Sequence, residues 1–278
     1  MGTFYTGVKN SVYTNSIAAL TADYACEMAG GSADCSSTWT DLSSKLKILV
    51  ENKDTDQEWH PEYENFPKMN PFWNGGGKVK QADVTMLHFP MNRMLSKGSM
   101  RNDLEKYEPL YDAEGPAMTL SVSVVLWLRL GNLDRANALL LNSTRNIQTP
   151  FNIWTESATK NQHQTLKDEG CFNFLTGAGG FLQSIAFGYG GLKYGRDECE
   201  MRPTLPLNST SMKFRSIEFQ GGRYSFEMLS DKSCELCIVQ GSHYKIAWND
   251  SDSFTSLEQG ECSRSDSCLR MRLRRIES

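Results

Sequence analysis

The hydrophobic residues of this chain change their spacing once, near residue 195. Before that point apolar residues recur every three or four positions, which is typical of amphipathic helices. Beyond it they alternate with polar residues, as in strands that bury one face. This order predicts a helical part followed by a β part, with the boundary between residues 195 and 205.

Helical spacing covers several segments of the first part. The segments 51–77 and 142–169 lie between them and lack periodicity, so we expect long loops there, and loops of that length are often functional. The most apolar run, 120–130, is too short to span a bilayer and contains Arg129, which favours a core helix. Helices are predicted over 11–28, 42–50, 79–87, 117–130, 133–141 and 181–187.

In the second part, the clearest alternation flanks the pair Gly221-Gly222 and predicts a β-hairpin. Residues 269–274 alternate Leu or Met with Arg, which we interpret as an edge strand with a solvated face. The net charge of −4 gives no basic field for a phosphate backbone, so no nucleic-acid partner is expected. The inward positions of the hairpin are Ile217, Phe219, Tyr224, Phe226 and Met228.

Two patterns could be mistaken for cofactor sites. Cys234 and Cys237 form a CxxC, but a zinc or redox site needs a second pair or a βαβ context, so we interpret the pair as structural. The glycine run 176–180 lacks the Gly-Lys-Ser/Thr ending of a phosphate loop, and close backbone packing explains it better. No metal or cofactor is expected. Residues 1–10 have no basic start followed by an apolar run, so no secretory signal is expected, and the compartment stays open.

Three stretches combine the residue types that glycoside chemistry uses. Cleaving an acetal needs a proton donor for the leaving oxygen and a base for water, and sugars stack on aromatic rings and bond to charged or amide groups. Each stretch alone has a simpler explanation, because a single Glu is usually solvated and a buried Lys-Asp pair is usually structural. The stretches are His60-Pro61-Glu62-Tyr63, Lys80-Gln81-Ala82-Asp83 and Trp154-Thr155-Glu156.

Five sequence blocks occur in the order seen in glycoside hydrolase family 65, which the chain resembles over about residues 5–195. The likeness is strongest to members that act on the glucosyl-galactosyl unit of collagen hydroxylysine, and it is weaker in the β part. The blocks are 7–15 (GVKNSVYTN), 79–84 (VKQADV), 115–118 (GPAM), 153–156 (IWTE) and 173–183 (NFLTGAGGFLQ).

The resemblance implies a mainly α chain. Residues 1–197 would be the C-terminal part of an (α/α)6 barrel, and 198–278 a small β-sandwich-like domain. The family's N-terminal β-sandwich and first barrel helices would be absent, which leaves an incomplete barrel. A part of a closed helical barrel exposes large apolar faces, so one hypothesis is that the chain does not fold alone.

The resemblance also implies a carbohydrate site and an inverting hydrolysis of an α-glucoside. Glu156 matches the general base that activates water, and its presence favours hydrolysis over phosphorolysis. Lys80 and Gln81 match the pair that holds the glucose beside the broken bond, and Trp154 helps to shape that pocket. The expected partner is an α-glucoside, with no membrane partner.

The general acid of the family is a Glu in an Asp-Glu-Tyr-His stretch, and its position falls on Thr3, with Tyr5 in place of the His. A threonine has no titratable proton near neutral pH and cannot replace a carboxylic acid. Two hypotheses follow. Either this sequence is a fragment of a working glucosidase, or it is a shortened, inactive paralogue that binds a glycan without cleaving it.

Overall fold

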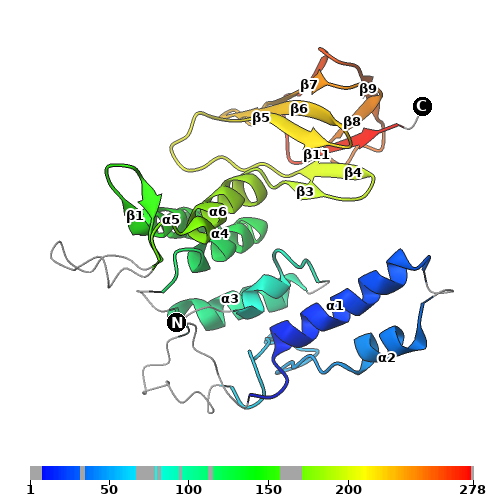
Figure 1. Ribbon diagram of the computed structural model, residues 1–278. Helices are drawn as coiled ribbons and strands as arrows, with labels where there is room; N and C mark the ends of the chain where they lie inside the picture. Colours follow the sequence, from blue (N-terminus) through cyan, green and yellow to red (C-terminus); the bar gives the residue numbers. More distant parts are fainter. Residues whose placement is uncertain are drawn as a thin grey trace.

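The computed structural model describes residues 8–31, 35–66, 79, 83–93, 96–111, 115–156 and 171–276. Figure 1 shows the helices gathered in one part of the molecule and most strands in another. The last helical element, the π-helix η5, covers Ser184–Tyr189, and β3 begins at Lys193. The predicted change from helix to strand near residue 195 is therefore confirmed.

The first helices form an antiparallel pair, α1 (Val12–Met28) and α2 (Ser37–Lys45). The side chains of Ser11 and Ser36 cap their N-termini by accepting backbone N–H groups, and Gly30 and Gly31 follow α1 with positive φ. We predicted that the second helix would reach residue 50, but it ends at Lys45. Residues 48 and 49 pack against the neighbouring core cluster, and Leu46 is extended.

The segment before residue 118 contains one helix that the sequence pattern missed, α3 (Lys97–Tyr107). Its apolar face is narrow, because Leu104 and Tyr107 are its only large apolar buried residues, so the periodicity is weak. Of the helix predicted over 79–87, only the short 3-10 helix η1 (Asp83–Leu87) forms among the described residues, and Val79 makes an isolated bridge instead. A second 3-10 turn, η2 (Glu108–Leu110), follows α3.

The helices predicted over 117–130 and 133–141 are confirmed as α4 (Thr119–Arg129) and α5 (Leu133–Ser143). Helix α4 is buried on most of its surface, because α5, α6 (Leu175–Gln183) and η5 pack around it. Between α5 and α6 lie the 3-10 turn η3 (Thr144–Asn146) and a two-stranded hairpin, β1 (Ile147–Gln148) with β2 (Ile153–Trp154).

The second part folds as two sheets that share one core. One sheet has the order β10-β7-β6-β5 and the other the order β3-β4-β11-β8-β9. Phe226 and Leu236 from the first sheet pack in the same buried cluster as Met201 and Leu273 from the second. The strands are β3 (Lys193–Tyr194), β4 (Glu198–Met201), β5 (Ser211–Phe219), β6 (Gly222–Leu229), β7 (Cys234–Gln240), β8 (Tyr244–Trp248), β9 (Thr255–Leu257), β10 (Cys262–Ser265) and β11 (Met271–Arg275).

The predicted hairpin is confirmed, with β5 and β6 paired so that Ile217 faces Tyr224 and Phe214 faces Phe226. The prediction of an edge strand over 269–274 is wrong. Strand β11 lies between β4 and β8 in the middle of its sheet. Its Arg272 is only 9% exposed.

These sheets make the chain α+β, so the expectation of a mainly α chain is also wrong. The sequence pattern located only part of the strand content, because short strands such as β3 and β9 carry too few residues for a visible alternation. Cys237 forms a disulfide with Cys262 of β10 rather than with Cys234, and Cys26 pairs with Cys35. Among the described residues, no helix has the length and apolar character that crossing a membrane requires.

Candidate functional site

The stretch Trp154-Thr155-Glu156 lies at the end of the small β1–β2 hairpin. Trp154 pairs with Ile147 across the hairpin, and Thr155 is fully buried. The N–H of Thr155 donates to the carbonyl of Asn146 at 3.0 Å, which ties the strand end to the residue just before β1. The chain is therefore held rigidly as it enters Glu156.

The backbone of Glu156 is held from three sides. Its N–H donates to the carbonyl of Cys171 at 3.0 Å, and its carbonyl accepts from Ala117 N–H at 3.1 Å and from Asn146 Nδ2 at 3.0 Å. The side chain is half-buried, and its Oε2 accepts the N–H of Cys171 at 3.4 Å. A carboxylate fixed in this way can serve as a base toward a bound water.

The indole of Trp154 packs on helix α6. Its ring lies 5.7 Å from that of Phe181, and its Nε1 donates to the carbonyl of Ser143 at 3.4 Å. A Cβ atom at Gly177 would come within 2.8 Å of this indole, and one at Gly180 within 2.7 Å of the hydroxyl of Ser121. The glycine run inside α6 thus allows close packing, as the sequence analysis predicted.

The proposed sugar-binding pair, Lys80 and Gln81, lies outside the described residues, as do Thr3 and Tyr5. The residues that flank the pair are described. Val79 is buried and forms a parallel bridge with Tyr111, and Asp83 is the first residue of η1.

The structure brings together the first two polar stretches. The Asp83 carboxyl lies close enough to Glu62 to repel a charge on it. Burial and this repulsion raise the pKa of Glu62 to about 8, and burial raises the pKa of Asp83 as well. Glu62 is therefore protonated at neutral pH.

A buried histidine–carboxylate cluster lies beside this pair. Nδ1 of His60 and Nε2 of His88 both bond to Oδ2 of Asp103, at 2.9 and 2.7 Å, and the N–H of His60 donates to Oδ1 at 2.7 Å. All three residues are almost fully buried. Their ligand atoms lie close enough together to hold a metal ion, but hydrogen bonding accounts for these distances. The cluster joins the loop around His60, the turn after η1 and helix α3.

Two members of this cluster, His88 and Asp103, were not predicted from the sequence. The only signal for His88 was its place after the apolar residues of the 79–87 segment. Asp103 lies in α3, a helix that the hydrophobic pattern did not predict. Of the three residues in the cluster, only His60 lies in one of the stretches that were selected for their residue chemistry.

Tyr111 connects this region to α4. Its hydroxyl bonds to Ser123 at 3.1 Å, and its backbone N–H donates to Glu108. Burial raises the pKa of Tyr111 to about 12, so its hydroxyl stays neutral. Helix α4 in turn starts just after Ala117, which bonds to Glu156. Contacts through Tyr111, α4 and Ala117 thus connect the region around Val79 with Glu156.

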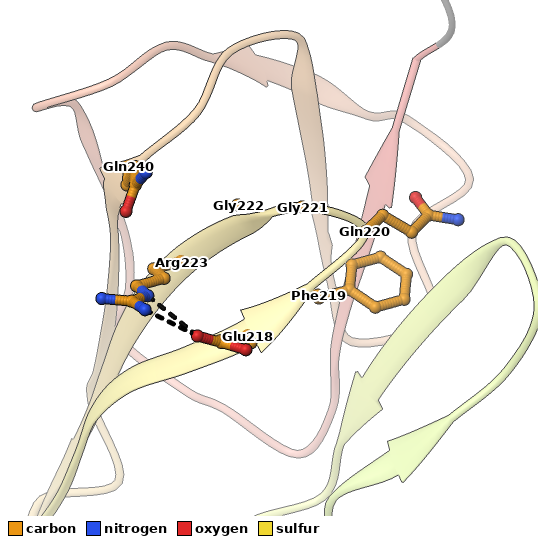
Figure 2. A pocket seen from close by; sticks show the side chains of 7 residues that line it. All are labelled: Glu218, Phe219, Gln220, Gly221, Gly222, Arg223 and Gln240. Carbon is orange, nitrogen blue, oxygen red and sulfur yellow. Dashed lines mark hydrogen bonds and ion pairs between the residues drawn. The ribbon is translucent and has the colours of Figure 1, made fainter.

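The pockets of the β part that the described residues line are separate from the three polar stretches of the helical part. One such pocket, with a volume of about 330 Å³, lies at the β5–β6 turn. There Arg223 forms an ion pair with Glu218 across the hairpin at 2.7 Å (Figure 2). The walls of this pocket come from the hairpin and from Gln240, and none of its residues belongs to the predicted site.

Comparison with known proteins identifies relatives that act on glycosides. The chain is 36% identical over 230 residues to a protein-glucosylgalactosylhydroxylysine glucosidase of Danio rerio, with 82% of this chain and 32% of that protein covered. A protein of the same name from Dictyostelium discoideum is 35% identical over 261 residues, with 88% and 34% covered. A kojibiose hydrolase of Mucilaginibacter mallensis is 30% identical over 225 residues, with 76% and 29% covered. No family model matches the chain.

Among solved structures, the fold is similar to a putative kojibiose phosphorylase from the human microbiome. The TM-score is 0.66 at 16% sequence identity, and the match covers 93% of this chain and 40% of that one. The chain spans about a third of the length of these curated relatives.

Proposed function

Because this chain belongs to the glycoside hydrolase family 65-like proteins, we propose that it is the C-terminal part of an enzyme that hydrolyses an α-glucoside. The substrate proposed is the glucosyl-galactosyl unit of collagen hydroxylysine, which the names of two relatives support. The reaction inverts the anomeric carbon and releases glucose, with Glu156 as the general base toward water.

The observation that carries this proposal is the rigid hold on Glu156. Three backbone hydrogen bonds, to Ala117, Asn146 and Cys171, fix the residue at the junction of the β1–β2 hairpin and α4. A general base works only when its oxygen stays within hydrogen-bond reach of the attacking water, so a fixed backbone favours this role.

The sugar would be held by Lys80, Gln81 and Trp154. An indole gives an apolar face for the sugar ring, and the ammonium and amide groups bind its hydroxyls. The Trp154 indole packs closely against Gly177 and Phe181. This packing supports a sugar-binding pocket whose aromatic side is formed before the sugar binds.

We further propose that residues 1–197 form part of an (α/α)6 barrel and that 198–278 form a separate small β domain. The exposed apolar side chains of the helical part support this division, because they are the surface that further barrel helices would cover. They include Tyr24 and Met28 on α1, Leu42 on α2, and Leu175 and Leu182 on α6.

A second candidate function is glycan binding without cleavage. Thr3 stands at the position that matches the general acid, and its hydroxyl cannot protonate a glycosidic oxygen. A chain of this kind would keep the sugar-binding residues and the base but would lack the first half of the reaction.

The deciding experiment starts with the natural protein purified from its source. Its intact mass and peptides show whether it extends beyond the 278 residues of this sequence. It is then incubated with glucosyl-galactosyl-hydroxylysine, and NMR follows the anomer of the glucose released. Hydrolysis to β-glucose supports the inverting enzyme, binding without release supports the glycan-binding alternative, and neither binding nor release excludes both.

The role of Glu156 is tested in the same protein with Glu156→Gln. The amide keeps the shape but cannot accept a proton, so the turnover rate should fall by about 100-fold or more while the substrate still binds. Glu64→Gln, a similar change at a partly buried carboxylate that bonds to Asn10, is the matched control and should keep the rate. An unchanged rate in Glu156→Gln would remove Glu156 from the mechanism.

A further inference from the structure

Three asparagines of this chain lie in the pattern Asn-x-Ser/Thr, which accepts N-linked glycans in proteins of the secretory pathway. They are Asn142, Asn208 and Asn249. The pattern alone does not separate them. A glycan is bulky, so a folded protein can carry one only where the amide is exposed and where the fold does not use it.

The side chain of Asn249 is used by the fold. Its Nδ2 donates to the carbonyl of Ser267 at 2.7 Å. Its Oδ1 accepts the N–H groups of Leu269 and Arg270 at 2.7 and 3.3 Å. These bonds hold the chain after β8 against the segment that leads into β11. A sugar on Nδ2 would have to fit inside this network, so Asn249 is not an acceptor in the folded protein.

Asn142 lies in the last turn of helix α5. Its Oδ1 accepts from Nη1 of Arg145 at 3.4 Å. The hydroxyl of Thr144, the third residue of the pattern, donates to the carbonyl of Leu141 at 2.7 Å. The transferase has to reach both the amide and the hydroxyl, and here the helix end occupies both. Asn142 is therefore a poor acceptor, although it is exposed.

Asn208 has the opposite environment. It is the third residue of a turn between β4 and β5, in which the N–H of Ser209 donates to the carbonyl of Pro206 at 3.2 Å. Its φ of +62° suits this turn position, which asparagine tolerates better than most residues. The residue is exposed. In the part of the chain that the structure describes, neither its amide nor the hydroxyl of Thr210 makes a hydrogen bond.

The disulfides indicate a compartment in which this modification takes place. Cys26 pairs with Cys35, and Cys237 pairs with Cys262. Structural disulfides form in oxidising compartments such as the lumen of the endoplasmic reticulum and are rare in the cytosol. A chain that acquires these bonds there also meets the transferase that modifies Asn-x-Ser/Thr.

We propose that Asn208 carries an N-linked glycan in the natural protein. In this step Nδ2 attacks the anomeric carbon of an oligosaccharide that is linked to a lipid diphosphate. A C–N bond forms, the C–O bond to the diphosphate breaks, Nδ2 loses one proton and the lipid diphosphate leaves. No oxidant or reductant takes part. The proposal does not depend on the proposed function, because it uses no residue of the candidate site.

The first test uses the natural protein purified from its source. Peptide N-glycosidase in heavy-oxygen water converts each glycosylated asparagine into a labelled aspartate, and mass spectrometry of the peptides gives the occupancy of each position. We expect the label at Asn208, less of it at Asn142 and none at Asn249. An unlabelled Asn208 overturns the proposal, and a labelled Asn249 overturns the argument from hydrogen bonding.

The second test follows the gel mobility of variants of the full-length protein, made in cells of its source, before and after treatment with the glycosidase. The mobility shift should be lost in Asn208→Gln and in Thr210→Val. Thr210→Ser is the matched control, because it keeps the hydroxyl of the pattern, and the shift should remain there and in Asn142→Gln. A shift that persists in Asn208→Gln and disappears in Asn142→Gln would assign the glycan to the helix end instead.

Discussion

The indole ring of Trp154 lies against Gly177 so closely that a Cβ atom at position 177 would come within 2.8 Å of it. The contact explains why a glycine occurs in the middle of a helix, where it costs about 1 kcal/mol relative to alanine. It also links the candidate site to the packing of α6, because the residue that follows Trp154 leads directly into Glu156.

Gly177→Ala should therefore destabilise the protein by about 1–3 kcal/mol, since the added methyl group must displace Trp154 or Ala117. Gly179→Ala, in the same helix with open space around it, should instead stabilise by about 0.5–1 kcal/mol. Urea unfolding of the two variants measures both. Equal effects of the same sign would mean that the indole does not occupy this position.

Asp103→Asn should be among the most destabilising single changes in the helical part. The buried carboxylate accepts bonds from two imidazoles and one backbone N–H, and an amide cannot replace all three. We expect a loss of about 3 kcal/mol in the free energy of unfolding. Glu105→Gln, on the exposed side of the same helix, should change it by less than about 0.5 kcal/mol. A small effect of Asp103→Asn would contradict the buried cluster.

The stability of the protein should fall as the pH rises from about 4.5 to about 8 because of Glu62. The pKa of this group is raised from 4.5 to about 8 in the folded state, so within that window the folded protein holds a proton that the unfolded chain has released. One such group lowers the unfolding free energy by at most about 1.4 kcal/mol per pH unit.

Glu62→Gln removes this dependence, because the amide does not titrate. Urea unfolding at several pH values between 5 and 8 should give a flatter profile for the variant than for the parent. Tyr107 and Tyr111 stay neutral over this pH range, because burial raises their pKa values, so the difference between the two profiles reports the Glu62 carboxyl together with its repulsion of Asp83. Parallel profiles would show that Glu62 is ionised in the folded protein.

The Cys237–Cys262 disulfide closes a loop of 25 residues and joins β7 to β10. Replacing both cysteines by serine should lower the unfolding free energy by about 3 kcal/mol, because the unfolded chain gains the freedom of the open loop. Cys171→Ser, at an exposed free cysteine, is the control and should have no effect. Thermal unfolding under non-reducing conditions checks the difference, and equal melting temperatures would contradict it.

Local patterns predicted the elements with dense or regular apolar residues. Helix α4 follows from its apolar run, and the β5–β6 hairpin follows from an alternation that fixes its inward face. The amphipathic signal of α3 is weak, because only Leu104 and Tyr107 of its large apolar residues are buried. Its main buried polar residue, Asp103, takes its importance from His60 and His88, which lie far away in the sequence.

The candidate site, too, was predicted from the sequence only in part. The stretch around Glu156 was found from residue types and from its resemblance to a family, but the three bonds that hold its backbone come from residues 117, 146 and 171. The repulsion between the carboxyl groups of Glu62 and Asp83 couples two residues that are separated by 20 intervening residues in the sequence. No local pattern predicts such a pair.

The sequence by itself determined that a helical part precedes a β part, the hairpin turn at Gly221-Gly222 and the blocks that mark the family. Tertiary structure alone decided that β11 lies inside its sheet and that Oε1 of Glu62 is buried near a second acid. The reason is physical. Periodicity records which side of an element avoids water, whereas strand neighbours and pKa values depend on which distant groups the fold brings into contact.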